Sequence, residues 1–154
     1  MLKYENFTYE LAEKFNDLVD EEIDSCSILG FFDFLREFRL YEKGPDGDVI
    51  GKYAFCVFDD DIPVGFISCE TYPDKKGITC QIMPVAVFKD FRRKGYGTKM
   101  VNGMKKGPFI NEKVTCFSAI VHKENKAGLE FFKKNGFKKD KKRDSEILMK
   151  CFVK

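Results

Sequence analysis

One stretch decides the fold of this 154-residue chain: Val85-Ala86-Val87-Phe88-Lys89-Asp90-Phe91-Arg92-Arg93-Lys94-Gly95-Tyr96-Gly97-Thr98. Its pattern predicts a strand, a tight loop and the start of a helix. Two glycines at a helix start let the backbone approach a ligand closely, and the unbonded N–H groups of the first turn favour an anion. Because Arg92, Arg93 and Lys94 add positive charge, the stretch predicts a site for a pyrophosphate or a similar anion.

Two other phosphate-binding motifs fit this stretch poorly. A dinucleotide-binding fingerprint needs a third glycine where Met100 stands, and an acidic residue about 20 positions further on, where the chain offers only Glu112. A Walker A loop needs Gly-Lys-Ser/Thr, which is absent from the stretch. A glycine-rich turn that binds no ligand stays open as an alternative.

Helices and strands alternate after this stretch. The expected elements are a helix over 95–106, a strand over 114–121, a helix over 125–135, and two closing strands over 137–139 and 146–153. Gly136 stands where a left-handed helix C-cap belongs. A strand, a helix and a second strand in succession imply a parallel crossover within a mixed sheet.

Three strands are predicted before the crossover, as an antiparallel meander. They run over 52–58, 64–70 and 78–88, with turns at 59–63 and 72–77. Pro84 interrupts the third strand, and because proline cannot donate to a ladder, we expect a bulge or a splayed edge there.

The N-terminal third is predicted to be helical. Apolar residues with helical spacing mark a first helix, capped by Thr8: Leu11, Phe15, Leu18, Val19 and Ile23. A second helix is expected over 30–41, ended by turn residues at 44–47. The predicted fold class is therefore α/β (α+β), with a mixed, mostly antiparallel central sheet flanked by helices.

Length and composition are those of one domain, 1–154. Hydrophobic residues make up 44% of the chain, and Phe alone supplies 17, enough for a core without metal or disulfide staples. The six cysteines form no CxxC unit and His122 is the single histidine, so we expect reduced, buried thiols and no metal site. No apolar run reaches the roughly 20 residues that span a bilayer, and no signal peptide is recognised, so a cytosolic protein is expected.

The central stretch resembles the GNAT N-acetyltransferase superfamily. Arg92-x-x-Gly95-x-Gly97 is similar to its R/Q-x-x-G-x-G/A signature, and Val85-x-Val87 precedes it at the right distance. A second block is also present, Val121-x-x-x-Asn125 followed by Phe131 to Phe137. The resemblance covers roughly residues 50–154 and implies a GNAT acyl-CoA N-acyltransferase fold with acetyl-CoA as co-substrate.

The resemblance also implies roles for individual residues. The backbone of Val85 and Val87 would pair with the pantetheine arm. The backbone N–H groups that follow Arg92 in the signature would hold the pyrophosphate, namely those of Arg93, Lys94, Gly95, Tyr96, Gly97 and Thr98. Asn125 would bond to the pantetheine or its neighbourhood. Strands splaying apart between Val87 and Val121 would admit the thioester.

The acid and base positions of the family are not kept in this chain. Phe132 stands where many members have a proton-donating tyrosine, and Gln81 and Ile120 stand at the two positions where different members carry a base. A substitute base is Glu70, at the end of the second predicted strand, with a solvated carboxylate as the alternative interpretation. Tyr72 is a candidate acid, and His122 a further candidate base, although packing or surface roles stay open for both.

Charge is distributed unevenly along the chain. Residues 1–48 hold 5 Lys/Arg and 13 Asp/Glu, a net charge of −8, so the remaining residues carry +10 of the total of +2. In the family the N-terminal helices wall the acceptor, so an acidic segment suggests a cationic small molecule or peptide amine. Solvated acids and a phenylalanine core are the alternative interpretation. Nucleic acid and membrane partners are not expected, since the lysines are scattered and match no nucleic-acid module.

The predicted function is acetyl transfer from acetyl-CoA to a primary amine. Two alternatives stay open: a non-catalytic acetyl-CoA sensor that has lost its acid and base, and a transferase of longer acyl groups. The sequence is compatible with a monomer or a homodimer.

Overall fold

The computed structural model describes residues 1–6, 10–11, 51–107, 110 and 112–153, with side chains at all of these except 52, 83 and 84. Glu10 and Leu11 are helical, as predicted for the first helix. The rest of the two predicted N-terminal helices, including the acidic cluster, lies outside the described residues.

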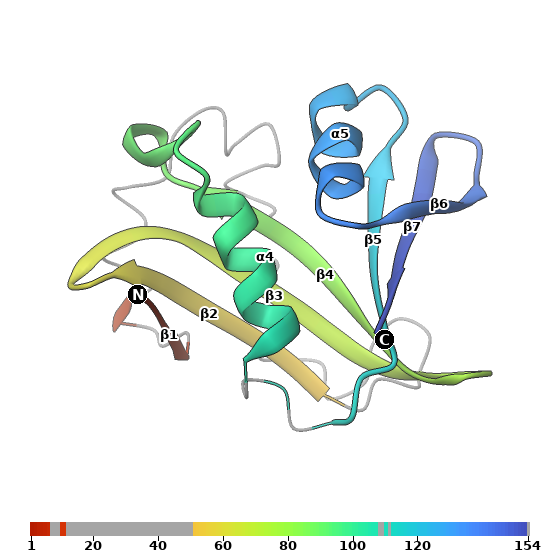
Figure 1. The fold of residues 1–154 in the computed structure, drawn as a ribbon, viewed down its shortest axis with the longest axis horizontal. Coiled ribbons are helices and arrows are strands. Elements are labelled where there is room, and N and C mark those ends of the chain that lie inside the picture. The colour runs from red at the N-terminus through yellow and green to blue at the C-terminus, as the bar shows by residue number, and fades with distance from the viewer. Residues whose placement is uncertain (7–9, 12–50, 108–109, 111, 154) are drawn as a thin grey trace.

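One sheet organises this part of the chain (Figure 1). Its elements in chain order are β1 (Leu2–Asn6), β2 (Gly51–Asp59), β3 (Ile62–Asp74), β4 (Gly77–Val87), the 3-10 turn η1 (Lys89–Phe91), α4 (Tyr96–Lys106), β5 (Cys116–His122), α5 (Lys126–Lys134), β6 (Lys138–Lys142) and β7 (Glu146–Phe152). The seven described strands lie in the order β1-β2-β3-β4-β5-β7-β6. Only β4 and β5 pair in parallel, which confirms the mixed, mostly antiparallel sheet and its crossover.

The sheet is divided into two wings by the short pairing of β4 with β5. Only Thr79–Gln81 of β4 pair with Cys116–Ser118 of β5, and beyond those residues the two strands separate. Figure 1 shows the strands meeting near the C-terminus and diverging toward the end where α5 lies. One wing therefore holds β1 to β4 with α4, and the other holds β5 to β7 with α5.

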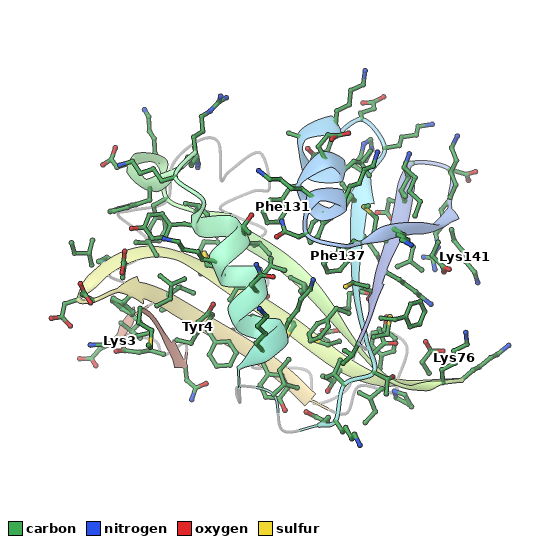
Figure 2. All side chains as sticks on the ribbon, in the orientation of Figure 1. Lys3, Tyr4, Lys76, Phe131, Phe137 and Lys141 are labelled. Carbon is green, nitrogen blue, oxygen red and sulfur yellow. The ribbon has the colours of Figure 1, made fainter. Side chains whose placement is uncertain are left out.

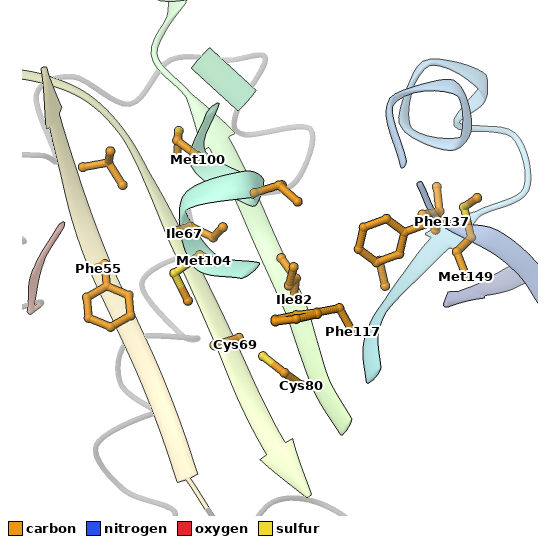
Figure 3. Packing of buried hydrophobic residues seen from close by; sticks show 14 of the residues in the cluster. Phe55, Ile67, Cys69, Cys80, Ile82, Met100, Met104, Phe117, Phe137 and Met149 are labelled. Atoms are coloured by element: carbon orange, nitrogen blue, oxygen red, sulfur yellow. The ribbon is translucent and has the colours of Figure 1, made fainter. Parts of the chain in front are cut away.

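The main core lies between the sheet and α4 and extends into the second wing. Figure 3 shows its side chains from β2, β3 and β4 below α4, with Phe137 and Met149 on the far wing. Phe117 of β5 is 3% exposed and belongs to the same cluster as Ile82 of β4. The wings thus share one apolar core even though few backbone hydrogen bonds join them.

A second apolar cluster covers the opposite face of the sheet. Cys56, Phe66 and Phe88 are buried there, and Leu11 packs against them. Cys56 alternates with Phe55 and Val57 along β2, and Phe66 is followed by Ile67 on the other face of β3, as the two-residue period of a strand requires. Both faces of the first wing are therefore covered.

The N-terminal strand β1 was not predicted, because the expected order began with a helix. Leu2 to Asn6 pair antiparallel with Asp59 to Phe55, which makes β1 an edge strand. The hydroxyl of Tyr4 donates to the carbonyl of Met100 at 2.9 Å, and burial raises the pKa of this phenol to about 12. A Cβ on Gly103 would lie 2.0 Å from the Tyr4 oxygen, so glycine is needed on α4 for β1 to dock.

The turn predicted at 72–77 is wrong, because β3 and β4 continue through it. Tyr72 pairs with Thr79 and Asp74 with Gly77, which leaves only residues 75 and 76 to connect the strands. Pro73 suggested a turn, but within the described residues β2 pairs with β3 only up to Thr71. Beyond it the described ladder of β3 is the one with β4, a kind of position that tolerates a proline.

The bulge expected near Pro84 is present in the backbone. Ile67 pairs with Val85 and Cys69 with Ile82, so β4 has one extra residue between these pairs. A bulge bends its strand, and this one comes just before the part of β4 that separates from β5.

Candidate functional site

The loop that joins β4 to α4 exposes the helix N-terminus. Gly95 is the N-cap residue, in the left-handed conformation with φ +84°, and Arg93 shares that region at φ 60°. The N–H of Lys99 donates to the carbonyl of Gly95 at 3.1 Å and closes the first turn. The N–H groups of Tyr96, Gly97 and Thr98 precede this bond and have no partner within the helix, so they are available to an anion.

Side chains brace this loop against β4 and β2. Arg92 donates from Nε to the carbonyl oxygen of Val87 at 2.9 Å, which holds its guanidinium beside the helix start. The hydroxyl of Tyr96 donates to Asp59 at 2.6 Å, and this bond raises the pKa of the phenol. The loop is therefore held in place before any ligand binds.

Gly97 lines the cleft and also has a packing contact that the sequence did not predict. A Cβ at this position would lie 3.0 Å from the ring of Phe131, which reaches from α5 toward α4 (Figure 2). By contrast, nothing lies within 4 Å of a Cβ on Gly95. Gly95 is thus required for its positive φ, and Gly97 for the packing of α5 against α4.

The start of α5 forms the facing wall. Asn125 is its N-cap, with Oδ1 accepting the Gly128 N–H at 2.9 Å. The Nδ1 atom of His122 accepts the Glu124 N–H at 3.3 Å, which leaves Nε2 as the proton-bearing nitrogen of the neutral ring. The Phe132 ring packs edge-on against Phe131 and Phe137.

A cleft of about 1020 Å³ runs between the two wings. Its lining residues come from β4, the loop, α4, β5 and α5: Ile82, Val85, Val87, Phe91, Arg92, Arg93, Gly95, Tyr96, Gly97, Thr98, Ile120, Val121, His122, Asn125, Ala127, Gly128, Phe131 and Phe132. One end combines the α4 N-terminus with two arginines, and the rest is mainly apolar. A ligand with an anionic part and a long apolar or amide part fits this distribution.

The cleft brings together most of the residues singled out in the sequence. Of the cofactor residues, all but Lys94 line it; Lys94 is exposed, with its Nζ 5.8 Å from the centre of the Phe91 ring. Glu70 does not line it and pairs with Gln81 on the neighbouring strand. The sequence did not point to Phe91, Ala127 or Phe131 as lining residues; the helical spacing of Ala127 and Phe131, four residues apart, is the signal that places both on one face of α5.

Polar side chains gather where β4 and β5 part, on the face opposite α4. Gln81 and Ser118 are the last paired residues, and Tyr72 of β3 contacts both. Glu70 lies beside Gln81 in the register of β3 and β4. This polar group adjoins the cleft on the β5 side, because Ile120, two residues after Ser118 and on the same face of β5, lines it.

The cysteines provide no second reactive centre among the described residues. Cys56, Cys69, Cys80 and Cys116 are buried and free, as predicted. Cys151 is also free but only partly buried, and Cys26 lies outside the described residues. Burial raises the pKa of Cys56 to about 12 and also raises that of Cys116, so both remain thiols at neutral pH. In the described part of the chain no three His, Cys, Asp or Glu side chains gather as metal ligands, and no helix is long and apolar enough to cross a membrane.

The comparisons with known proteins agree on one family. The family model for Acetyltransferase (GNAT) family matches residues 15–137. Acetyltransferase PseH of Campylobacter jejuni is 29% identical over 142 residues, which are 89% of this chain and 85% of that protein.

Solved structures share the fold over nearly the whole chain. The structure of C. jejuni PseH in complex with acetyl coenzyme A gives a TM-score of 0.66 at 17% identity, covering 100% of both chains. A chimera of the Vibrio cholerae spermidine N-acetyltransferase SpeG and hSSAT gives 0.70 at 12% identity, covering 98% of this chain and 94% of that one.

Proposed function

This chain belongs to the GNAT acetyltransferase family and is an acetyl-CoA-dependent N-acetyltransferase, and from this premise we propose that it acetylates a primary amine through the cleft between its two wings. The supporting observation is that the α4 N-terminus opens into a cleft that continues to the point where β4 and β5 separate. An anionic pyrophosphate and a thioester on one long arm match the two ends of such a cleft.

The proposed roles follow the geometry. First-turn N–H groups of α4, with Arg92 and Arg93, hold the pyrophosphate, and the freed backbone edge of β4 at Val85 and Val87 pairs with the pantetheine arm. Asn125 uses its Oδ1 to cap α5, so the group with which it would bond to the ligand is its amide N–H. The amine nitrogen then bonds to the thioester carbon and the carbon–sulfur bond breaks. The amine gives one proton to the general base, and the leaving thiolate takes one from water.

We propose Glu70 as the general base, acting directly or through water. It lies opposite Gln81 in the register of β3 and β4, beside the point where the strands part. A lysine-like amine has a pKa of about 10.4, so an enzyme that lacks the family's base needs another group to take the proton. A positioned base contributes about 10²–10⁴-fold. Glu70→Gln is expected to lower kcat by at least about tenfold across pH 6–9, and an unchanged rate over that range would remove Glu70 from the mechanism.

The proposed acceptor is a cationic amine, such as a polyamine, an aminoglycoside or a lysine-containing peptide. The support is the net charge of −8 on residues 1–48, which in this family border the acceptor, and the spermidine specificity named for one structural neighbour. We propose 1–48 as the acceptor side and 49–154 as the acetyl-CoA core of one domain. Better acetylation of neutral amines than of polycations at low salt would contradict this acceptor class.

The test is release of the CoA thiol from acetyl-CoA with a panel of spermidine, an aminoglycoside, a lysine peptide and an N-terminal peptide. Release that depends on an amine supports the transferase and identifies the acceptor class.

Arg93→Ala is expected to weaken acetyl-CoA binding about three- to tenfold, more at low salt, because it removes a cation beside the helix N-terminus. Lys89→Ala, an exposed lysine in the same loop and outside the cleft, is the matched control. Acetyl-CoA binding without release for any amine would favour a sensor instead.

A further inference from the structure

Three polar side chains meet at the point where β4 and β5 stop pairing. Gln81 and Ser118 are opposite each other there, and their neighbours Cys80 and Phe117 belong to the main core under α4. Since side chains alternate along a strand, Gln81 and Ser118 point to the other face of the sheet. Tyr72 contacts them from β3, although the sequence predicted that this residue lies in a turn.

In this group, donors and acceptors can be assigned to each hydrogen bond. The Tyr72 hydroxyl donates to Oε1 of Gln81 at 3.2 Å, and it lies 3.5 Å from Oγ of Ser118. A phenol has a single proton, so with that proton on Gln81 the contact with Ser118 must be donated by the serine. The chain therefore runs from Ser118 through Tyr72 to Gln81, and the phenol oxygen retains capacity to accept a further bond.

Burial indicates which member a substrate can reach. Ser118 is 0% exposed, and within the described residues Tyr72 is the one hydrogen-bond partner found for its Oγ. Tyr72 is only partly buried. Ser118 is therefore closed to a substrate, whereas Tyr72 and Gln81 are both partly buried and can be reached. Tyr72 is not itself a lining residue of the cleft, but Ile120 is, and it follows Ser118 by two residues on the same face of β5.

We propose that the Tyr72 oxygen accepts an N–H hydrogen bond from the acceptor amine and so orients its lone pair toward the thioester. Ser118 and Gln81 act as positioning residues, because they fix the direction of the Tyr72 proton. Tyr72 forms no covalent bond and gives up no proton in this role, which differs from the acid suggested by the sequence. The inference rests on the proposed function, because it needs an amine acceptor in the cleft.

The test is steady-state kinetics of Tyr72→Phe, a change that removes only the oxygen. With whichever amine of the panel the wild-type chain acetylates fastest, kcat/KM for the amine is expected to fall about 10- to 100-fold, as for the loss of one well-placed hydrogen bond. The Kd for acetyl-CoA is expected to stay within about twofold. Tyr53→Phe is the matched control, because its hydroxyl bonds to Glu112 on the α4 face, away from this group.

A second variant separates orientation from simple packing. Ser118→Ala is expected to lower kcat/KM by a smaller factor than Tyr72→Phe. The double variant of Ser118→Ala with Tyr72→Phe is expected to be no worse than Tyr72→Phe alone, because both changes interrupt the same series of hydrogen bonds. Independent, multiplying losses, or equal losses in Tyr53→Phe, would overturn the inference. So would full activity of Tyr72→Phe in an enzyme whose wild type transfers acetyl. A wild-type chain that releases no thiol with any amine would overturn the proposed function itself.

Discussion

Two glycines at the start of α4 are needed for different physical reasons. Gly95 and Gly97 belong to one signature, yet the structure requires them for different reasons. At Gly95 the backbone has a positive φ with open space around a would-be Cβ, and at Gly97 the ring of Phe131 occupies that space. The sequence predicted that both were glycines of an anion site, but it could not show that one of them serves the contact between α4 and α5.

Gly97→Ala tests this contact. Alanine in a helix gains up to about 1 kcal/mol in propensity, whereas overpacking costs about 1–3 kcal/mol, so we expect a net loss of about 1 kcal/mol in unfolding free energy. The displaced Phe131 also narrows the cleft, so acetyl-CoA affinity is expected to fall about tenfold. Urea unfolding and isothermal titration measure the two effects.

The control for this prediction is a second change on α5. Gly97→Ala with Phe131→Leu is expected to recover acetyl-CoA affinity, because a leucine at 131 is smaller than the phenylalanine and leaves room for the alanine methyl group. Gly95→Ala is expected to cost about 1–2 kcal/mol through its backbone conformation alone, with no recovery from Phe131→Leu. Equal recovery in both pairs would show that Phe131 is not the obstacle.

At the scale of elements, the periodic segments could be predicted and the irregular ones could not. Strand 52–58 and helix 125–135 follow from apolar spacing and from Gly136, which has the positive φ expected of a helix-ending glycine. The N-cap role of Asn125 was not predicted. β1 was missed because a five-residue edge strand with one half-buried side contributes little apolar signal. The hairpin after Tyr72 was misplaced because a proline and a polar run resemble a turn, while the ladder with β4 that overrides them is not local.

The Asp74 carboxylate stabilises the β3–β4 hairpin in a pH-dependent way. Its carboxylate accepts the Lys75 N–H at 2.5 Å and the Thr79 hydroxyl at 3.1 Å, with Lys150 3.9 Å away. These bonds, the Lys75 amide first, lower the pKa of Asp74. A lowered pKa means that the stabilisation is complete above the ordinary aspartate value of about 3.9 and is lost as pH falls through that value to the folded one.

Asp74→Asn removes the charge at every pH. We expect the variant to be less stable than the wild type by about 1 kcal/mol near pH 7, a value kept small by solvent screening. The difference should stay constant down to about pH 5 and shrink as pH falls below the ordinary aspartate pKa of about 3.9. Denaturant unfolding across this range measures it, with Asp61→Asn, 97% exposed in the β2–β3 turn, as the control. A difference that grows on acidification would contradict the assignment.

At the scale of the whole molecule, the cleft lies where the sheet is weakest. Three residue pairs join β4 to β5, while the apolar cluster continues across the gap through Phe117 and Met149. The family signatures predicted both walls of the cleft from the sequence, at 92–98 and at Asn125. They could not predict the polar group at Tyr72 and Ser118, because it depends on the register of the β3–β4 hairpin and on its pairing with β5, which is distant in the chain.

A ligand that contacts both walls should stabilise the two wings together. Acetyl-CoA at about 100 times its Kd is expected to add about 2.7 kcal/mol of stability, which for a chain of this size raises Tm by about 5–10 °C. Because the cleft is lined from α4 and from α5, hydrogen exchange should slow both at 95–98 and at 120–128. The β2–β3 turn at Asp60 and Asp61, which lies outside the cleft lining, should exchange as before. Protection confined to α4 would mean that acetyl-CoA binds one wing and leaves the other free, and the amine would then have no enclosed route to the thioester.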